Sequence, residues 1–326
     1  MPPTMDQNKY LIIINPISGT GSKQGVSRLI EQKLRDKGYQ PKTVYTTAHG
    51  DATRFTKQAV ACDYKAVIAV GGDGTVNEVA SALCDSNTAL GIIPAGSGNG
   101  LARHLDIPID VHEALDVILK DNIIDCDYGT ANERPFFCTF GVGFDAAVSE
   151  KFAHQKRRGK MSYVKSAISE YISYNPQTYT ISANGQILTQ KAFIVAVCNA
   201  SQYGNNAYIA PTASITDGLL DITIVHAGTP LTTAIVGVDL FTGYINRNTL
   251  IHTFRAPSAV IYRSSPGPAH IDGDPMSMDD VMTIKCHPRA LRIFTPGESR
   301  VRPIITPLIS TFRDIRSGVT RLFRKR

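Results

Sequence analysis

Short apolar runs alternate with polar, glycine-containing turns along the first third of the chain. The runs Tyr10–Ile14, Lys65–Val70 and Ala89–Ile93 are rich in β-branched residues and too short for buried helices, so they predict strands covered on both faces. Apolar residues recur at helical spacing between them, near residues 26–34 and 51–62. Strands and helices in alternation predict a doubly wound parallel sheet with right-handed crossovers.

The pattern changes in the second half of the chain, where short runs rich in β-branched and aromatic residues are separated by turns. These runs predict strands at Tyr179–Ala183, Ala192–Cys198, Leu220–Val225, Ala259–Tyr262, Met282–Lys285 and Leu291–Phe294. Residues 149–174 and 231–251 are expected to be helical at least in part. We therefore predict an α/β domain over residues 1–130, a β-rich, antiparallel sandwich-like domain over residues 131–300, and a tail over residues 301–326.

The turn after the strand Lys65–Val70 reads Gly71-Gly-Asp-Gly-Thr-Val-Asn-Glu78. Glycine permits backbone conformations with positive φ and lets an anion approach bare N–H groups. An aspartate in this position, Asp73, would repel a phosphate unless a cation lay between them. The octet therefore indicates a nucleotide phosphate bound together with a divalent metal, although a tight strand-to-helix turn alone also fits it.

Two further turns of the same composition follow predicted strands, at Asn15–Ser22 and Pro94–Arg103. The carboxyl ends of parallel strands share one edge of a sheet, so the three turns are expected to meet there and to present N–H groups to a single polyphosphate. The sequence has no P-loop motif, no Gly-x-Gly-x-x-Gly after a strand and no Gly-x-Ser-x-Gly elbow, which argues against those three classes.

With these motifs the chain resembles the diacylglycerol kinase catalytic-domain family, which includes bacterial lipid kinases and sphingosine kinases. The resemblance covers roughly residues 9–295, and its motifs occur in the family's order. They are Asn15-Pro-Ile-Ser-Gly19, the octet, Pro94-Ala-Gly-Ser-Gly-Asn99, Gly141-Val-Gly-Phe-Asp145, Asp217-Gly-Leu-Leu-Asp221 and His270-Ile-Asp-Gly-Asp274. The octet alone is shared with NAD kinases.

The resemblance implies that ATP binds between an α/β domain and a β-rich domain, and that Asp73 organises its phosphates through Mg²⁺. Residues at matching positions form the expected nucleotide-binding set. They are Asn15, Ser18, Gly19, Thr46, Gly72, Asp73, Gly74, Thr75, Asn77, Glu78, Gly96, Ser97, Gly98 and Asn99.

Phosphoryl transfer also needs a base for the attacking hydroxyl, and three acids are candidates: Asp145, Asp272 and Asp274. Aspartate is common in turns, so each also fits a structural role. In similar sequences the acid at the Asp145 position contacts substrate, and a late Asp-Gly-Glu motif supplies the proton acceptor. This chain has Asp274 where glutamate is usual, which shortens the side chain by one methylene and leaves the choice of base open.

A second metal site is implied at Asp217 and Leu220, because Asp217-Gly-Leu-Leu-Asp221 resembles the family's structural Mg²⁺ turn. A carboxylate and a following carbonyl are suitable oxygen ligands for a small cation. A hairpin with an ordinary Asp-Gly turn fits the same letters.

Charge is concentrated at the end of this chain of 326 residues and net charge +6. Residues 311–326 carry six basic residues against Asp314 alone, and apolar residues recur among them at helical spacing. A basic amphipathic helix suits an anionic membrane, so we expect residues 308–326 to contact anionic lipid. A helix packed on the body of the protein is the alternative.

The sequence thus predicts an ATP- and Mg²⁺-dependent kinase of a lipid hydroxyl, of the diacylglycerol or sphingoid-base type, at a membrane surface. With no signal-peptide pattern and no long apolar run, a cytoplasmic, peripherally membrane-associated protein is expected. Nothing in the body of the chain suggests nucleic acid as a partner. An NAD kinase, a kinase of a soluble metabolite and a non-catalytic lipid- or nucleotide-binding regulator stay open, as does the oligomeric state, a homodimer included.

Overall fold

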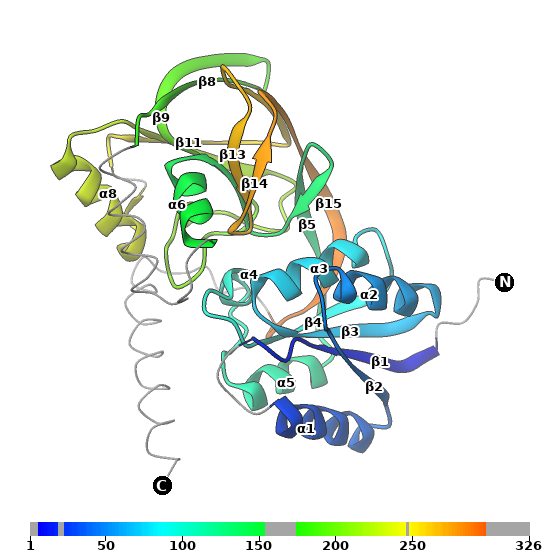
Figure 1. The fold of residues 1–326 in the computed structure, drawn as a ribbon. Coiled ribbons are helices and arrows are strands. Elements are labelled where there is room, and N and C mark those ends of the chain that lie inside the picture. Colours follow the sequence, from blue (N-terminus) through cyan, green and yellow to red (C-terminus); the bar gives the residue numbers. More distant parts are fainter. Residues whose placement is uncertain (1–5, 19–22, 154–173, 246–247, 298–326) are drawn as a thin grey trace, which may run out of the picture.

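The structure, a computed structural model, describes residues 6–18, 23–153, 174–245 and 248–297 and shows two lobes (Figure 1). The first lobe follows the predicted alternation. Its elements are β1 (Asp6–Ile14), α1 (Lys23–Asp36), β2 (Gln40–Tyr45), α2 (Asp51–Ala61), β3 (Tyr64–Gly71), α3 (Asp73–Leu83), β4 (Ala89–Pro94), α4 (Gly100–His104) and α5 (Val111–Leu119).

The four strands of this lobe form a parallel sheet in the order β2-β1-β3-β4. Helices α2 and α3 lie over one face, and α1 and α5 over the other (Figure 1). The central strands are buried on both faces, as the apolar runs at Ile12–Ile14 and Ala66–Val70 require. Burial of each large apolar side chain contributes roughly 1.5–3 kcal/mol to stability. This core therefore stabilises the sheet that carries the glycine-rich turns.

The second lobe is built mainly from antiparallel strands. Its elements, with those that link it to the first lobe, are β5 (Ile123–Ala131), β6 (Arg134–Phe136), β7 (Thr139–Gly143), α6 (Phe144–Ala153), β8 (Gln177–Ala183), β9 (Gln186–Cys198), β10 (Leu220–His226), α8 (Pro230–Thr242), β11 (Ile251–Ala256), β12 (Ser258–Tyr262), β13 (Gly267–Ile271), β14 (Asp274–Met278) and β15 (Val281–Phe294). Inward residues of β7, β9, β10, β12 and β13 form a second apolar core.

Strand β15 belongs to both lobes. Its first half pairs with β12 in the second lobe, and Ile293, near its end, pairs in parallel with Leu90 of β4. Strand β5 runs antiparallel to β15 on both sides of a register shift between His287 and Leu291. One continuous sheet therefore joins the parallel and antiparallel halves of the molecule.

The predicted fold class is confirmed: a parallel sheet with helices on both faces precedes an antiparallel, β-rich lobe. The predicted helical stretch over residues 231–251 is shorter in the structure, because α8 ends at Thr242, followed by Gly243 with a φ of 76°, and β11 begins at Ile251. The predicted nucleotide contact Gly19, much of the expected helix at 149–174, and the basic segment 308–326 lie outside the described residues.

Candidate active site

The three glycine-rich turns meet at the carboxyl edge of the parallel sheet. The Asn15 N–H donates to the Val70 carbonyl, and the Ala95 N–H donates to the Gly71 carbonyl at 2.7 Å. A Cβ atom built on Gly96 would lie 2.5 Å from the Cα of Gly72, so the second and third turns touch backbone to backbone. This close approach leaves no room for a larger residue at either position.

Asp73 lies at the start of α3 and links the second turn to the third. Its carboxylate accepts the N–H groups of Asn99 (2.8 Å) and Gly100 (2.7 Å). Burial raises the pKa of Asp73 above its ordinary value, and these two N–H groups act in the opposite direction. A cation at this carboxylate would offset the cost of keeping it charged.

Two predicted nucleotide contacts, Asn15 and Asn99, hold the turns in place: Asn99 bonds within its own turn, and Asn15 connects the first turn to the second. The Asn99 side chain accepts from the Gly96 N–H (3.0 Å) and donates to the Gly96 carbonyl (2.9 Å), and its backbone has a φ of 54°. The Asn15 amide donates to the Thr75 hydroxyl (3.3 Å), while its oxygen accepts the Ile17 N–H. In these turns Ser97 is exposed and Ser18 is half-buried.

Glu78, also in the predicted nucleotide set, lies beside the neighbouring helix α2. The Glu78 carboxylate accepts the N–H groups of Gly50 and Ala52, both at 3.1 Å, and contacts His49. It therefore caps the N-terminus of α2, where a negative charge is favoured. Thr46 follows β2, and its N–H donates to the Ile14 carbonyl at 3.0 Å.

Asp272 comes from the second lobe, at the tip of the hairpin β13–β14. Asp272 and Gly273 have φ values of 49° and 88°, as a two-residue turn with two left-handed positions requires. Its carboxylate accepts three backbone N–H groups, from Phe137, Cys138 and Thr139 at 2.8–3.0 Å. It also accepts the side-chain amide of Asn77 in α3, at 2.8 Å, so it connects the two lobes.

Asp274 follows this turn and differs from Asp272 in its surroundings. It is exposed, and a Cβ atom built on Gly74 would lie 3.6 Å from its Oδ2 atom. Its carboxylate therefore stands beside the start of α3, next to the glycine-rich octet. The hairpin thus brings one of the three candidate bases to the predicted phosphate site.

Asp145, the third candidate base, is buried at the start of α6. It accepts hydrogen bonds from the Tyr203 hydroxyl (2.9 Å) and the N–H of Ala146 (2.8 Å), and the Nε2 atom of His270 lies 3.1 Å from its carboxylate. A Cβ atom on Gly141 would lie 2.3 Å from both Asp145 and His270, so only glycine fits beneath the pair.

The turn at Asp217, predicted to bind a structural metal, has an arginine beside its carboxylates. The guanidinium of Arg255 lies 3.6 Å from Asp217 and 3.2 Å from Asp221. Burial raises the pKa of Asp221, and Arg255 opposes that shift. Leu220 has its side chain in the core. Among the residues that the structure describes, no three acidic, histidine or cysteine side chains gather into a metal cage.

The carboxylate of Asp73 is chemically suited to Mg²⁺. This ion is commonly held by one or two carboxylates, with water and substrate phosphates completing its shell, so a three-residue cage is not required. Asp73 is the carboxylate among the glycine turns that would hold it.

Sequence reasoning gave no role to His270 or Tyr203, and it assigned Asn77 to the nucleotide. The position of His270 two residues before Asp272 was a signal for a role at this turn. The partner of Asn77 had no sequence signal, because Asp272 lies 195 positions away.

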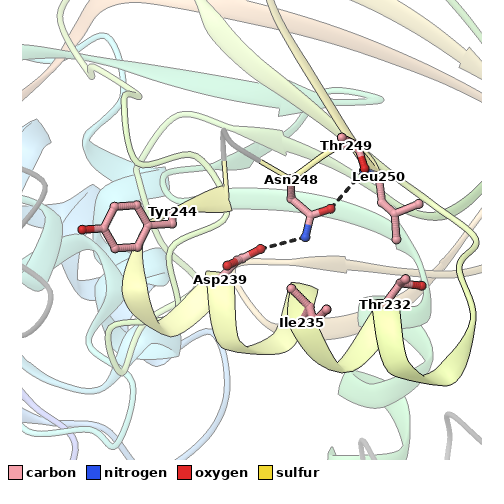
Figure 2. Close-up of a pocket in the computed structure, with 7 residues that line it drawn as sticks. All are labelled: Thr232, Ile235, Asp239, Tyr244, Asn248, Thr249 and Leu250. Carbon is pink, nitrogen blue, oxygen red and sulfur yellow. Dashed lines mark hydrogen bonds between the residues drawn. The ribbon is translucent and has the colours of Figure 1, made fainter.

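A cavity of about 560 Å³ lies apart from this set of residues, between α8 and the segment that follows it (Figure 2). Asp239 accepts the side-chain amide of Asn248 at 2.7 Å beside it. None of its lining residues belongs to the predicted nucleotide or catalytic sets. Within the described ranges, no helix is long and apolar enough to cross a membrane.

Comparison with known proteins identifies two consecutive domains. Residues 9–131 match the diacylglycerol kinase catalytic domain, and residues 138–295 match the YegS C-terminal NAD kinase beta sandwich-like domain. The first lobe, with its glycine-rich turns, thus corresponds to the catalytic domain of a kinase family, and the antiparallel lobe corresponds to that family's C-terminal domain.

Relatives and solved structures agree with this assignment. The chain is 30% identical over 280 residues to a "Probable lipid kinase YegS-like" of Pectobacterium atrosepticum, covering 84% of this chain and 92% of that protein. It is 30% identical over 218 residues to the "Diacylglycerol kinase" of Bacillus subtilis, covering 65% and 72%. A crystal structure of a putative diacylglycerol kinase from Bacillus anthracis str. Sterne superposes with a TM-score of 0.73 at 25% identity, covering 89% and 98%.

The chain belongs to the diacylglycerol kinase and YegS family of lipid kinases. Membership of this family implies the use of ATP.

Proposed function

We propose that this protein transfers the γ-phosphate of ATP to the hydroxyl of a membrane lipid, with Asp274 as the proton acceptor. The observation that carries the proposal is the docking of the β13–β14 hairpin on the start of α3. Through it, a carboxylate of the second lobe reaches the glycine turns of the first.

The first lobe supplies the phosphate cradle. The turns after β1, β3 and β4 offer backbone N–H groups, and the N-terminus of α3 adds the positive end of its helix dipole. Mg²⁺ bound with ATP supplies charge neutralisation, and Asp73 is the residue that would hold it. Phosphoryl transfer depends mainly on such positioning and electrostatic stabilisation.

The choice among the three acids follows from their exposure and their place in the fold. Asp145 is buried and Asp272 is half-buried, and each lies against protein groups on several sides. Asp274 is exposed, beside Gly74. A base must come within about 3 Å of the hydroxyl that it deprotonates, and we expect Asp274 to approach the lipid hydroxyl in this way.

The acceptor is proposed to be a lipid of the diacylglycerol or sphingoid-base type, which presents a primary hydroxyl. The names of the relatives in Bacillus subtilis and Pectobacterium atrosepticum support the lipid class. We propose further that the protein works as a cytoplasmic, peripheral membrane enzyme and that its basic segment 308–326 contacts anionic lipid.

The test is an incubation of the purified protein with γ-labelled ATP, Mg²⁺ and a total lipid extract, followed by identification of the labelled lipid. Parallel reactions contain NAD, or soluble alcohols without vesicles. Labelled lipid in the wild type, lost in Asp274→Asn, supports the proposal. Label on NAD or a soluble alcohol alone, or ATP turnover in none of the reactions, would refute it.

A further inference from the structure

A buried group of three side chains lies behind the hairpin that carries Asp272 and Asp274. It consists of Asp145, His270 and Tyr203, and His270 is only 1% exposed. His270 is in β13 directly opposite Gly141 of β7.

The hydrogen bonds of the His270 ring indicate its tautomer. The backbone N–H of Gly273 points to Nδ1 at 3.4 Å, and because an amide N–H can only donate, Nδ1 must be the unprotonated nitrogen. The ring proton therefore sits on Nε2 and is donated to Asp145 at 3.1 Å. The imidazole thus links Asp145 on one side to the hairpin turn on the other.

Asp145 is held in place by hydrogen bonds in addition to its contact with His270. Its other two donors are the Ala146 N–H, at the start of α6, and the Tyr203 hydroxyl. Tyr203 lies in a loop that also touches the nucleotide side, where the Asn205 N–H donates to the Gly98 carbonyl at 3.2 Å. Asp145 is therefore connected to the third glycine turn through the loop of Tyr203, and to the hairpin through His270.

We propose that His270 is a positioning residue that holds the Asp272–Asp274 turn against the phosphate site through the hydrogen bond from Gly273, and that Asp145 orients the His270 ring without contacting the acceptor lipid. This inference rests on the proposed function for its kinetic consequence. It differs from what the family resemblance implies for Asp145, because the carboxylate of this chain is buried and its partners are protein groups.

Two nearly isosteric variants each remove one of the two hydrogen bonds of the His270 ring and keep the other. In His270→Asn the side-chain oxygen takes the place of Nδ1 and still accepts from Gly273. In His270→Gln the side-chain amide takes the place of Nε2 and still donates to Asp145, but the acceptor for Gly273 is lost. Activity is measured with ATP and either dioleoylglycerol or sphingosine in detergent micelles, on the full-length protein.

We expect His270→Gln to lower kcat about tenfold, as misplacement of a base does, with the KM for ATP within about twofold of the wild type. His270→Asn should lose less than about threefold in kcat. Equal losses in the two variants, or the larger loss in His270→Asn, would overturn the positioning role.

A second measurement does not depend on activity. In ¹⁵N spectra of the wild type, His270 should show an unprotonated Nδ1 and a protonated Nε2. Hydrogen exchange at the Gly273 amide should be about tenfold faster in His270→Gln than in His270→Asn. The opposite tautomer, or equal exchange, refutes the link even if a variant is unstable. A wild type that phosphorylates no lipid but shows the expected tautomer and exchange refutes the proposed function alone.

Discussion

The side-chain amide of Asn77 donates a 2.8 Å hydrogen bond to the carboxylate of Asp272. The bond runs from α3 in one lobe to the tip of the β13–β14 hairpin in the other. The remaining donors to Asp272 are backbone groups of residues 137–139. Asn77 is therefore the side chain that links this carboxylate to the nucleotide-binding lobe.

Replacing Asn77 with alanine should destabilise the protein by about 1.5–3 kcal/mol, the usual range for a hydrogen bond to a charged group. Lipid phosphorylation should fall as well, because the hairpin loses its tie to α3. Urea unfolding and initial rates measure the two effects. Ser81→Ala is the matched control, since Ser81 contacts the other side of the Asn77 amide at 3.4 Å. A loss in Ser81→Ala as large as that in Asn77→Ala would contradict the role of the Asp272 bond.

Asp73 should make stability depend on pH in a defined direction. The pKa of Asp73 is raised in the folded protein, chiefly by burial. In the unfolded chain its pKa is about 4, so the carboxyl releases its proton at lower pH there. Between these two pKa values the folded state binds more protons, and the contribution of Asp73 to the free energy of unfolding falls as pH rises.

The difference in unfolding free energy between wild type and Asp73→Ala, measured in urea without nucleotide, should therefore decrease from pH 4.5 upward. A difference that grows with pH has the wrong sign for this account. The same variant should bind ATP and Mg²⁺ more weakly, seen as a smaller rise in melting temperature on their addition.

Substitutions of Asp274 and Asp272 should differ in effect: the first should lower turnover, and the second should lower stability. Asp274→Asn is expected to lower kcat by about 10²–10⁴-fold, the usual effect of removing a general base, with an unchanged melting temperature because the residue is exposed. Asp274→Glu should retain turnover, because the carboxylate is kept.

Asp272→Asn should lower the melting temperature, because an amide NH₂ would face backbone N–H donors in place of an acceptor. Calorimetry beside kinetic assays of each variant provides the comparison. If Asp272→Asn keeps its stability while losing all turnover, and Asp274→Asn is active, the two roles are reversed.

The basic segment should determine membrane contact. Changing Arg321, Arg324, Lys325 and Arg326 to serine is expected to weaken binding to phosphatidylserine vesicles, at up to about 1 kcal/mol per charge removed. Vesicle sedimentation at two salt concentrations measures the effect, with phosphatidylcholine vesicles as the control. Equal binding of the wild type to both kinds of vesicle would exclude an electrostatic contact.

The arrangement of the parallel sheet could be predicted because its signals are local. Apolar runs such as Lys65–Val70 and turns such as the octet can each be recognised from a few consecutive residues. Parallel topology then places the turns at one edge of the sheet. The motifs likewise located the acids Asp73, Asp145, Asp272 and Asp274.

The different surroundings of those residues could not be predicted, because they depend on partners far away in the sequence. Asp272 and Asp274 look equivalent in Asp-Gly-Asp, yet a turn with two left-handed residues directs one carboxylate to the backbone of 137–139 and leaves the other at Gly74. The cap that Glu78 forms on α2 and the approach of Arg255 to Asp217 are also products of tertiary packing.

The sharing of β15 between the lobes has a consequence for synthesis of the protein on the ribosome. The edge of β4 is paired only when residues near Ile293 have emerged, although β4 itself ends about two hundred positions earlier. The nascent amino-terminal half should therefore wait, with an open sheet edge, for the last strand. A fragment that stops before this strand is expected to aggregate, since an unpaired edge is a template for association with other chains.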